Sequence, residues 1–359
     1  MGVRRLLVTG GAGFIGSNFV HYWLTAHPND RVVVLDALTY AGNQANLEPV
    51  QDHPGFTMVH GDIRTPSLAA SLLRQHEISV VVHFAAESHV DRSIDGPDAF
   101  IDTNVRGTHE LLKAAREVWL EAGSPGTVAR FHHISTDEVY GSHGPGEPPF
   151  TETSRYAPSS PYAASKGASD HLVRAYRHTY GLPVTITNCS NNYGPYQLPE
   201  KLIPLMLVNM LEGRSLPVYG DGLNVRDWLY VEDHCRAIDA VIATSREGET
   251  YNVGGRNEWR NIDIVRLLCR LVEDAFVRDD ALAERFPECP AAHGRSLEQL
   301  ISFVPDRPGH DRRYAIDAGK IDRDLGFSPR ESFETGVRKT VDWYLSHETW
   351  WRPFTRRQA

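Results

Sequence analysis

The first half of the sequence alternates short apolar runs, rich in β-branched residues, with segments of helical periodicity. The runs at residues 4–9, 31–36, 56–62, 79–86, 130–136 and 183–188 are predicted to be strands. They are almost continuously hydrophobic, as strands covered on both faces of a sheet are. Helices are expected between them over 14–27, 65–76, 98–121 and 161–180. The alternation predicts an α/β fold with a doubly wound parallel sheet.

A glycine-rich segment, "VTGGAGFIG", lies between the first predicted strand and the first predicted helix, with Gly10, Gly13 and Gly16 as its glycines. This spacing lets the backbone turn tightly and bring a pyrophosphate to a helix N-terminus. Asp36 closes the second strand, where a carboxylate accepts hydrogen bonds from both ribose hydroxyls and repels a 2′-phosphate. The next residues, "ALTYAGN", contain no Arg or Lys to neutralise such a phosphate. A Rossmann-type site for NAD, not NADP, is predicted.

Two further strand ends are expected to meet this cofactor. "HGDIR" places Asp62 and Ile63 at the end of the third strand, near the expected adenine. "HFAAESHVD" places Phe84, Ala85, Ala86 and Ser88 at the end of the fourth strand, where the small residues among them let the dinucleotide approach closely. Asp62 alone is equally consistent with a helix cap, and its place at a strand end favours the cofactor.

After about residue 190 the pattern changes to segments rich in Gly, Pro and aromatic residues, which suit a pocket wall built from loops. Helices are expected at 231–244, 261–275 and 331–347, and only a loop with short helices at 276–300. We expect an NAD-binding Rossmann domain over 1–190, to which a segment near 225–245 returns. A smaller substrate-binding lobe is expected to consist mainly of 191–359.

The formal net charge of −9 argues against nucleic acid or an anionic membrane as the main partner. A small anionic substrate is still compatible, because a basic pocket can occur in an acidic protein. No apolar run approaches membrane-spanning length. The cysteines are scattered without any CxxC pair, which indicates reduced thiols in a cytoplasmic protein and no metal site. They are Cys189, Cys235, Cys269 and Cys289.

"SPYAASKGASDHL" places Tyr162 and Lys166 four residues apart at a helix start, and therefore on one face. An adjacent ammonium, together with a positive nicotinamide, stabilises phenolate and lowers the pKa of the phenol. Tyr162 could then deprotonate an alcohol while the alcohol carbon gives hydride to NAD. YxxxK alone is more often an ordinary surface pair. The glycine segment and Thr136 at the end of the fifth strand favour the catalytic interpretation.

In this order the glycine segment, the strand-end Thr and YxxxK resemble the extended short-chain dehydrogenase/reductase superfamily. The resemblance implies hydride chemistry on a nucleotide sugar, by an epimerase, a decarboxylase or a dehydratase.

The adjacent acids Asp137 and Glu138 in "ISTDEVYG" favour elimination of water. Oxidation of a sugar carbon acidifies the neighbouring C–H, so that one carboxylate can remove that proton while a protonated carboxyl protonates the leaving hydroxyl. Crowded acids tend to have their pKa values pushed apart, which gives one donor and one acceptor. Both side chains can face a substrate from a loop but not from a regular strand. The alternative is that one of the two acids is structural.

A longer series of motifs resembles the dTDP-glucose 4,6-dehydratase family: "HISTDEVYG", "AAESHVDRSI", "SPYAASK", "NCSNNYGPYQ", "PEKLIP", "YGDGLNVRDWLYVEDH" and "DRPGHDRRYAID". The resemblance implies that hydride leaves sugar C4 for NAD, water is lost across C5–C6, and hydride returns to C6. Asp137 would protonate the leaving hydroxyl and Glu138 would take the C5 proton. Tyr162 would be the C4 base, Thr136 would bind the C4 oxygen, and Lys166 would hold Tyr162 and the nicotinamide ribose.

The resemblance also implies binding residues. Further cofactor contacts would be Phe14, Ile15, Leu38, Thr39, Thr103 and Asn192. Substrate contacts would be Ser88, Asn191, Lys201, Leu202, Pro217, Val218, Tyr219, Arg226, Asn261, Arg307 and His310. Arg226 and Arg307 suit the diphosphate and Tyr219 the pyrimidine. Asn191 and Asn192 could instead satisfy loop backbone groups.

Three alternatives stay open: a UDP-sugar 4,6-dehydratase, a sugar-nucleotide 4-epimerase, and a non-catalytic NAD sensor. The acid pair argues against the epimerase, and Tyr162 with Lys166 against the sensor, but neither separates dTDP from UDP. The resemblance further implies a homodimer formed through the helices at 98–121 and 161–180.

Overall fold

The computed structural model describes residues 2–122, 129–144, 146–244, 246–306 and 309–355. Its large sheet has seven parallel strands in the order β10-β6-β5-β4-β1-β2-β3. These strands are β1 (Arg5–Thr9), β2 (Arg31–Asp36), β3 (Phe56–His60), β4 (Val80–His83), β5 (Arg130–Thr136), β6 (Val184–Cys189) and β10 (Thr250–Val253). The doubly wound parallel sheet predicted from the sequence is confirmed.

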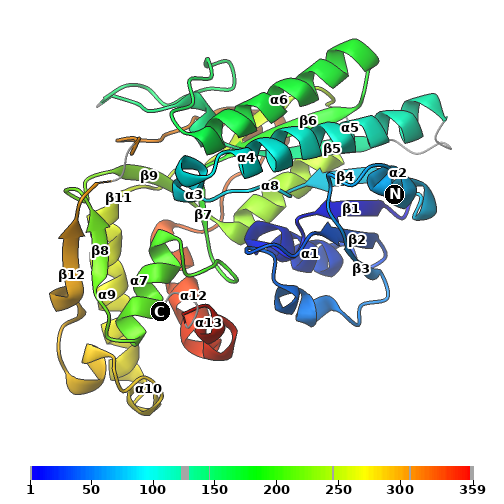
Figure 1. The fold of residues 1–359 in the computed structure, drawn as a ribbon. Coiled ribbons are helices and arrows are strands. Elements are labelled where there is room, and N and C mark those ends of the chain that lie inside the picture. Colours follow the sequence, from blue (N-terminus) through cyan, green and yellow to red (C-terminus); the bar gives the residue numbers. More distant parts are fainter. Residues whose placement is uncertain (1, 123–128, 145, 245, 307–308, 356–359) are drawn as a thin grey trace.

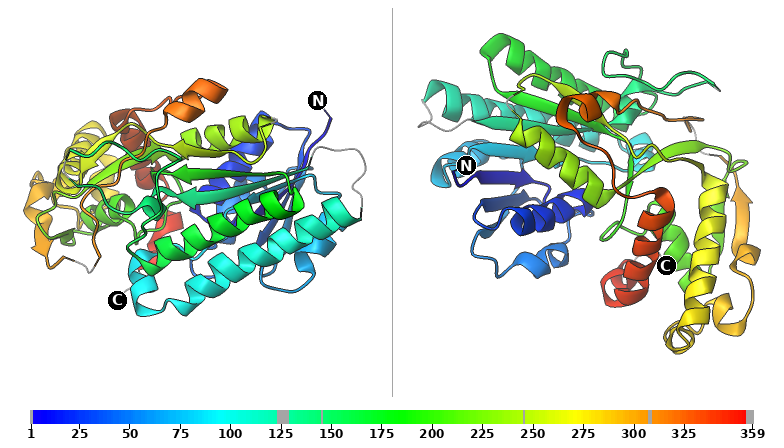
Figure 2. Two further views of the ribbon diagram at one scale, coloured as in Figure 1. Left: turned by 90° about the horizontal axis from the view of Figure 1, so that it is seen from above. Right: turned by 180° about the vertical axis from the view of Figure 1, so that it is seen from behind.

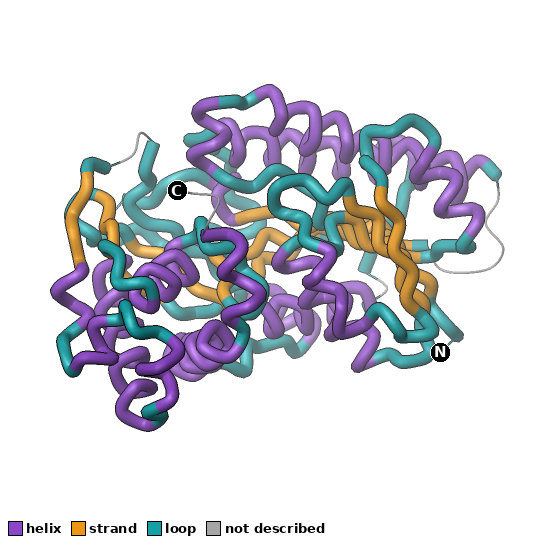
Figure 3. Tube along the Cα trace, turned by 60° about the horizontal axis from the view of Figure 1, so that its bottom comes forward, coloured by secondary structure: helices purple, strands orange, loops and turns teal. Residues whose placement is uncertain are grey.

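Apolar side chains cover both faces of this sheet, because successive strand residues point to opposite sides. Leu6 and Val8 of β1 pack with α1, η1 and α8, whereas Leu7 packs with α2, α5 and α6 on the other face. Figure 3 shows the strands between these helical layers. The helices of the first face are α1 (Phe14–Ala26), η1 (Gln44–Val50) and α8 (Val231–Ala243). Those of the second are α2 (Leu68–Gln75), α5 (Thr108–Arg116) and α6 (Pro161–Tyr180).

The predicted helix over 98–121 is continuous, but parts of it have the wider π-helical winding. Its parts are α4 (Asp98–Phe100), η2 (Ile101–Gly107), α5 and η3 (Glu117–Glu121), of which η2 and η3 are π-helical. It lies alongside α6, as the left panel of Figure 2 shows. π-Helical turns often occur at functional sites, and η2 contributes Thr103 to the cavity described below.

A second group of elements, at the lower left of Figure 1, surrounds its own apolar core. Its helices are α7 (Leu202–Leu211), α9 (Asn261–Arg278), α10 (Ala281–Arg285), α12 (Phe333–Ser346) and α13 (Glu348–Thr355). Two small sheets flank them, with strand orders β11-β9-β7 and β12-β8. Their strands are β7 (Asn191–Tyr193), β8 (Leu216–Tyr219), β9 (Val225–Tyr230), β11 (Glu258–Arg260) and β12 (Ile301–Val304).

Short elements complete the described chain: α3 (Val90–Asp95), η4 (Asp137–Tyr140), η5 (Pro290–His293), η6 (Leu297–Leu300) and α11 (Gly319–Leu325). The short helices expected within 276–300 are confirmed by α10, η5 and η6. No helix of the described ranges is both long and apolar enough to cross a membrane.

The sequence prediction missed several elements, among them β7, β11, β12, α11 and α13. β10 adds a seventh strand beside β6. α7 is apolar on almost every side, so its short run has no helical periodicity to detect. β8 and β9 lie in a segment predicted to be loop, because Arg226 and Asp227 interrupt the apolar pattern of β9. Both of these charged residues are nevertheless buried.

Candidate active site

A cavity of about 600 Å³ lies along the carboxyl edge of the large sheet and is also lined by residues of the second group of elements. The parallel strands β1 to β6 all deliver their carboxyl ends to this edge. Every described site residue predicted from the sequence lines the cavity except Leu38. Arg307 lies outside the described residues.

The glycine segment forms a close turn at the end of β1. Gly10 has φ +71°, and a Cβ there would lie 2.6 Å from the backbone nitrogen of Ala85. A Cβ at Gly16 would lie 2.2 Å from the carbonyl oxygen of Gly10. α1 begins at Phe14, and its N-cap Gly13 has no side chain to accept from the first-turn N–H groups. The turn therefore presents a helix N-terminus of the kind that binds phosphate.

Asp36 is held at the end of β2 by two backbone N–H groups. Ala12 N donates to Oδ2 at 2.9 Å and Leu38 N to Oδ1 at 2.8 Å. Burial raises the pKa of this carboxyl, and the two N–H groups oppose that shift. Leu38 does not line the cavity: its backbone fixes Asp36, and its side chain packs against the core beneath.

Asp62 lines the cavity and is not a helix cap, because the N-cap of α2 is Ser67. Its carboxylate accepts the backbone N–H of Arg64 at 2.7 Å. The Arg64 guanidinium pairs with it at 2.7 Å and lowers the pKa of the carboxyl. Asp62 is therefore an anion whose orientation is fixed before any ligand binds.

The adjacent acids Asp137 and Glu138 lie directly after the end of β5. β5 ends at Thr136, and η4 begins at Asp137, so the acids lie on a tight turn and are not constrained to opposite faces. Thr136 caps η4, because its hydroxyl accepts from Glu138 N at 3.3 Å. The same hydroxyl lies 3.4 Å from Asp137 Oδ1.

Asp137 is a buried acid with an unpaired oxygen. It is 2% exposed, and its Oδ2 has no hydrogen-bond partner among the described residues. Burial, followed by the nearby Glu138 and Asp227 carboxyls, raises its pKa well above the usual value. A neutral carboxyl can donate a proton, so Asp137 has the properties of a general acid.

In the polypeptide without cofactor the pKa of the Tyr162 phenol is raised, whereas the lowering expected from the sequence involves Lys166 together with a bound nicotinamide. Burial and the Glu138 carboxylate raise this pKa, while a hydrogen bond with Thr136 opposes the shift. The Nζ of Lys166 donates to the carbonyl oxygen of Ile134 at 2.7 Å. The polypeptide alone therefore favours the neutral phenol.

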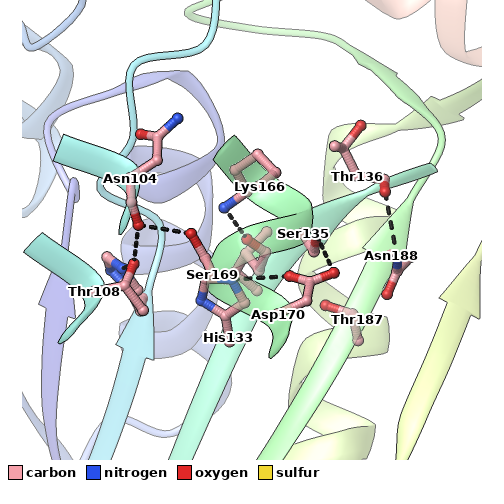
Figure 4. A network of polar contacts seen from close by, with 12 residues as sticks. Asn104, Thr108, His133, Ser135, Thr136, Lys166, Ser169, Asp170, Thr187 and Asn188 are labelled. Atoms are coloured by element: carbon pink, nitrogen blue, oxygen red, sulfur yellow. Dashed lines mark hydrogen bonds and ion pairs between the residues drawn. The ribbon is translucent and has the colours of Figure 1, made fainter. Parts of the chain in front are cut away.

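A buried polar network, shown in Figure 4, joins α6 to β5 beneath these residues. Asp170 is fully buried; it accepts from the Ser135 hydroxyl at 2.9 Å and lies 3.2 Å from His133 Nε2. Tyr156 OH also donates to Asp170, at 2.8 Å. Burial lowers the pKa of Lys166, and the Asp170 carboxylate opposes that shift. The network fixes the end of β5, with Thr136, relative to the helix that carries Tyr162 and Lys166.

The second group of elements contributes polar atoms that a ligand could satisfy. Oδ1 of Asn191 and Oδ1 of Asn261 are buried, line the cavity and have no hydrogen-bond partner in the described chain. Buried polar atoms are normally hydrogen-bonded, so such exceptions indicate a missing partner. Asn192 is different, because its amide already donates to Ser190 O at 2.9 Å and its Oδ1 lies 2.9 Å from His234 Nδ1.

Three basic side chains are oriented by protein contacts. Arg226 is buried and donates to the carbonyl oxygens of Val225 and Asp311, both at 2.8 Å. Lys201 Nζ donates to the carbonyl of Ser88 at 3.2 Å. His310 Nδ1 lies 2.5 Å from Asp306 Oδ1. Arg226 and Lys201 thereby bring positive charge to the cavity wall.

Sequence reasoning missed several lining residues. They include Arg64, Glu87, Cys189, Gln197, Glu200, Met206, Trp228, Val265 and Tyr314. Most of them lie within or next to the sequence motifs described above, so their position beside a motif was the signal that could have identified them. Val265 and Met206 are apolar helix residues that the pattern assigns to the core.

The chain is similar in sequence to known nucleotide-sugar dehydratases. The sequence profile of the family described as GDP-mannose 4,6 dehydratase matches residues 7–340. The dTDP-glucose 4,6-dehydratase of Neisseria meningitidis serogroup B is 55% identical over 351 residues, which cover 98% of this chain and 96% of that protein. The dTDP-glucose 4,6-dehydratase 1 of Escherichia coli K12 is 53% identical, with 96% and 94% covered.

Among solved structures, the fold is similar to that of DesIV, a dTDP-glucose 4,6-dehydratase from Streptomyces venezuelae crystallised with NAD. The TM-score is 0.86 at 49% identity, and 97% of this chain and 99% of that chain are covered.

Asp137→Asn is expected to stabilise the folded protein. Because folding raises the pKa of Asp137, the folded chain binds more protons than the unfolded chain above about pH 4, so its stability falls as the pH rises. Asparagine removes this penalty. Thermal unfolding should give a higher Tm for D137N than for the wild type at about pH 8, with the difference shrinking toward pH 4. Asp52→Asn, at an exposed position, is the control. An equal Tm at both pH values would show that Asp137 ionises normally in the folded protein.

Proposed function

The chain belongs to the dTDP-glucose 4,6-dehydratase family, and on that premise we propose that it converts dTDP-glucose to dTDP-4-keto-6-deoxyglucose with NAD as its cofactor. The observation that carries the proposal is the buried Asp137, whose pKa is raised well above its usual value, beside Glu138 within the same cavity as Tyr162. A proton donor and a proton acceptor side by side suit the elimination of water.

The residues of the cavity fit both ligands. The Gly10 and Gly16 turn leaves room for a pyrophosphate at the start of α1, and Asp36 can accept from ribose hydroxyls. On the other side, the unpaired amide oxygens of Asn191 and Asn261 suit the hydroxyl and N–H donors of a nucleotide sugar. NAD, when bound, supplies a hydride acceptor for C4, returns the hydride to C6, and adds positive charge near Tyr162.

The proposed roles follow from these positions. Tyr162 takes the proton of the C4 hydroxyl, and Thr136, which hydrogen-bonds with Tyr162, orients the C4 oxygen. Glu138 takes the C5 proton, and Asp137 gives a proton to the departing C6 hydroxyl, so that water leaves. The protonated Glu138 would give its proton back to C5 when hydride is delivered to C6. Lys166, fixed at the Ile134 carbonyl, holds the nicotinamide ribose. Because the polypeptide raises the pKa of Tyr162, the positive charges of Lys166 and the bound cofactor must lower it.

The remaining site residues would bind the ligands. On the cofactor side these are Gly13, Phe14, Ile15, Thr39, Asp62, Ile63, Phe84, Ala85, Ala86, Thr103 and Asn192. On the substrate side they are Ser88, Lys201, Leu202, Pro217, Val218, Tyr219, Arg226 and His310. The buried guanidinium of Arg226 is proposed to meet the diphosphate, and Tyr219 the pyrimidine.

The first test is incubation of the purified protein with dTDP-glucose or UDP-glucose, without added cofactor. We expect a product lighter by one water from dTDP-glucose, with no net change in nicotinamide absorbance, because the hydride is returned. Mass spectrometry of the sugar nucleotide provides the measurement. An unchanged mass with an altered sugar configuration would instead identify a 4-epimerase, and preference for UDP-glucose would identify a UDP-sugar dehydratase. Absence of reaction with added NAD would favour a non-catalytic sensor.

The proposed roles predict separable half-reactions. Glu138→Gln should still oxidise C4, so reduced nicotinamide should accumulate on the enzyme after dTDP-glucose is added. Tyr162→Phe should block oxidation, with no such absorbance. Turnover should fall about 10²- to 10⁴-fold in both variants, the usual contribution of a general acid or base. Glu288→Gln, which removes an exposed carboxylate, is the control. Equal behaviour of E138Q and Y162F in the absorbance assay would contradict the assignment.

A homodimer is part of the proposal. Ile101 and Leu120, on the helix over 98–121, are 51% and 41% exposed, and Tyr180 at the end of α6 is 43% exposed. Large apolar side chains exposed along two neighbouring helices suit contact with a second copy. The cytoplasmic location also stays a proposal, which the four buried free cysteines support.

Ile101→Arg should convert the dimer to a monomer, because it places a charge within the proposed interface. Size-exclusion chromatography with light scattering measures the mass. Val277→Arg is the matched control, since Val277 is 84% exposed on α9, away from these helices. A wild-type monomer, or a dimer that I101R leaves intact, would refute this interface.

A further inference from the structure

The C-terminal helix α13 reaches back to the N-terminal half of the chain. The indole N–H of Trp350 donates to Oδ1 of Asn46 at 2.8 Å. Asn46 belongs to η1, which packs against α1, and is only 1% exposed. Neither residue lines the cavity.

The other end of the Asn46 amide holds the glycine segment. Its Nδ2 donates to the carbonyl oxygen of Ala12 at 2.9 Å, and Asn43 N donates to the same oxygen at 3.0 Å. The N–H of Ala12 donates to Asp36 Oδ2 at 2.9 Å. Ala12 lies within the turn that holds Gly10 and Gly13, so both of its peptide groups are fixed from outside the turn.

The two partners of Asn46 select one orientation of its amide. An indole N–H can only donate and a backbone carbonyl can only accept, so Oδ1 must face Trp350 and Nδ2 must face Ala12. Loss of the indole N–H would leave Oδ1 buried without its donor and would remove one of the two contacts that disfavour the flipped amide. In that orientation, the carbonyl oxygen of Ala12 would lose its side-chain donor.

Trp350 is itself held in an aromatic cluster. Its ring centroid lies 5.1 Å from that of Trp343 and 5.8 Å from that of Tyr196. Tyr196 precedes Gln197, which lines the cavity. The indole is therefore presented to Asn46 by packing between α12, α13 and the segment after β7, and its direction is set before any ligand binds.

We propose that Trp350 and Asn46 are positioning residues of the dinucleotide site, through which the C-terminal helix holds the glycine turn in its phosphate-binding shape. They act through Ala12 and touch neither ligand. This inference rests on the proposed binding of NAD at the turn. Its consequence is that residue 350 helps to determine how slowly this chain releases its cofactor.

The test uses the holoenzyme and isotopically labelled NAD. Exchange of bound for labelled NAD is followed by mass spectrometry, and Tm and the KM for dTDP-glucose at saturating NAD are measured alongside. Trp350→Phe keeps the ring and removes the N–H. Asn46→Asp keeps the acceptor for Trp350 and removes the donor to Ala12. Trp343→Phe, in the same cluster, is the matched control.

We expect about tenfold faster NAD exchange in W350F and in N46D, the size of effect typical of one buried hydrogen bond. W343F should stay near the wild type, and the KM for dTDP-glucose should be unchanged. The double variant should exchange no faster than N46D, because both changes break one chain of bonds.

Three results would overturn the inference. These are wild-type exchange rates in both folded W350F and folded N46D, equal acceleration in W343F, and multiplication of the two effects in the double variant. A wild-type protein that binds no NAD would instead overturn the proposed function, and the inference with it. If one variant does not fold, the other still tests the same bond chain from its opposite end.

Discussion

Asp170 joins β5 to α6 in a place that water does not reach, and the geometry of the candidate site depends on that junction. The carboxylate accepts from Ser135 on the strand and pairs with His133, while its own helix carries Lys166 one turn earlier. The strand continues directly into Thr136 and the acid pair. A helix that slid along the sheet would break several buried hydrogen bonds at once, and breaking a buried charged network is strongly destabilising. Tyr162 and Thr136, which come from different elements, are thereby kept in register.

Burial has opposite consequences for the groups around this junction. It raises the pKa of Asp137, which favours a proton donor, but it also raises the pKa of the Tyr162 phenol, which is unfavourable for a base. Both effects have one cause, the cost of placing charge where water is excluded. In the proposed roles, the polypeptide alone therefore prepares the acid, whereas the base needs positive charge brought by the bound cofactor. Proton donation and proton abstraction are therefore linked to binding in different ways.

Much of this arrangement could be predicted from the sequence, because it depends on local patterns. Strand–helix alternation gave the sheet, and since parallel strands end at one edge, Asp36, Phe84 and Thr136 had to meet there. The end of the strand before Asp137 could also be predicted, because two adjacent acids cannot both face one substrate from a regular strand. The failures share a different cause. The charged residues Arg226 and Asp227 prevent recognition of β9 from its sequence, because their burial depends on partners far away in the chain. The contact between Asn46 and Trp350 spans 304 residues. No local pattern reports such pairs.

The position of β10 in the sheet has a consequence for synthesis of the chain. When residues 1–190 have left the ribosome, six strands of the sheet are present, but β6 is still an open edge, since its neighbour is encoded 60 residues later. Unpaired edges of apolar strands are where nascent chains associate wrongly. α8, which covers part of the same sheet, also emerges late. The dinucleotide-binding half of the molecule thus cannot complete its hydrogen bonding during its own translation, and it must remain protected until much of the second half has been made.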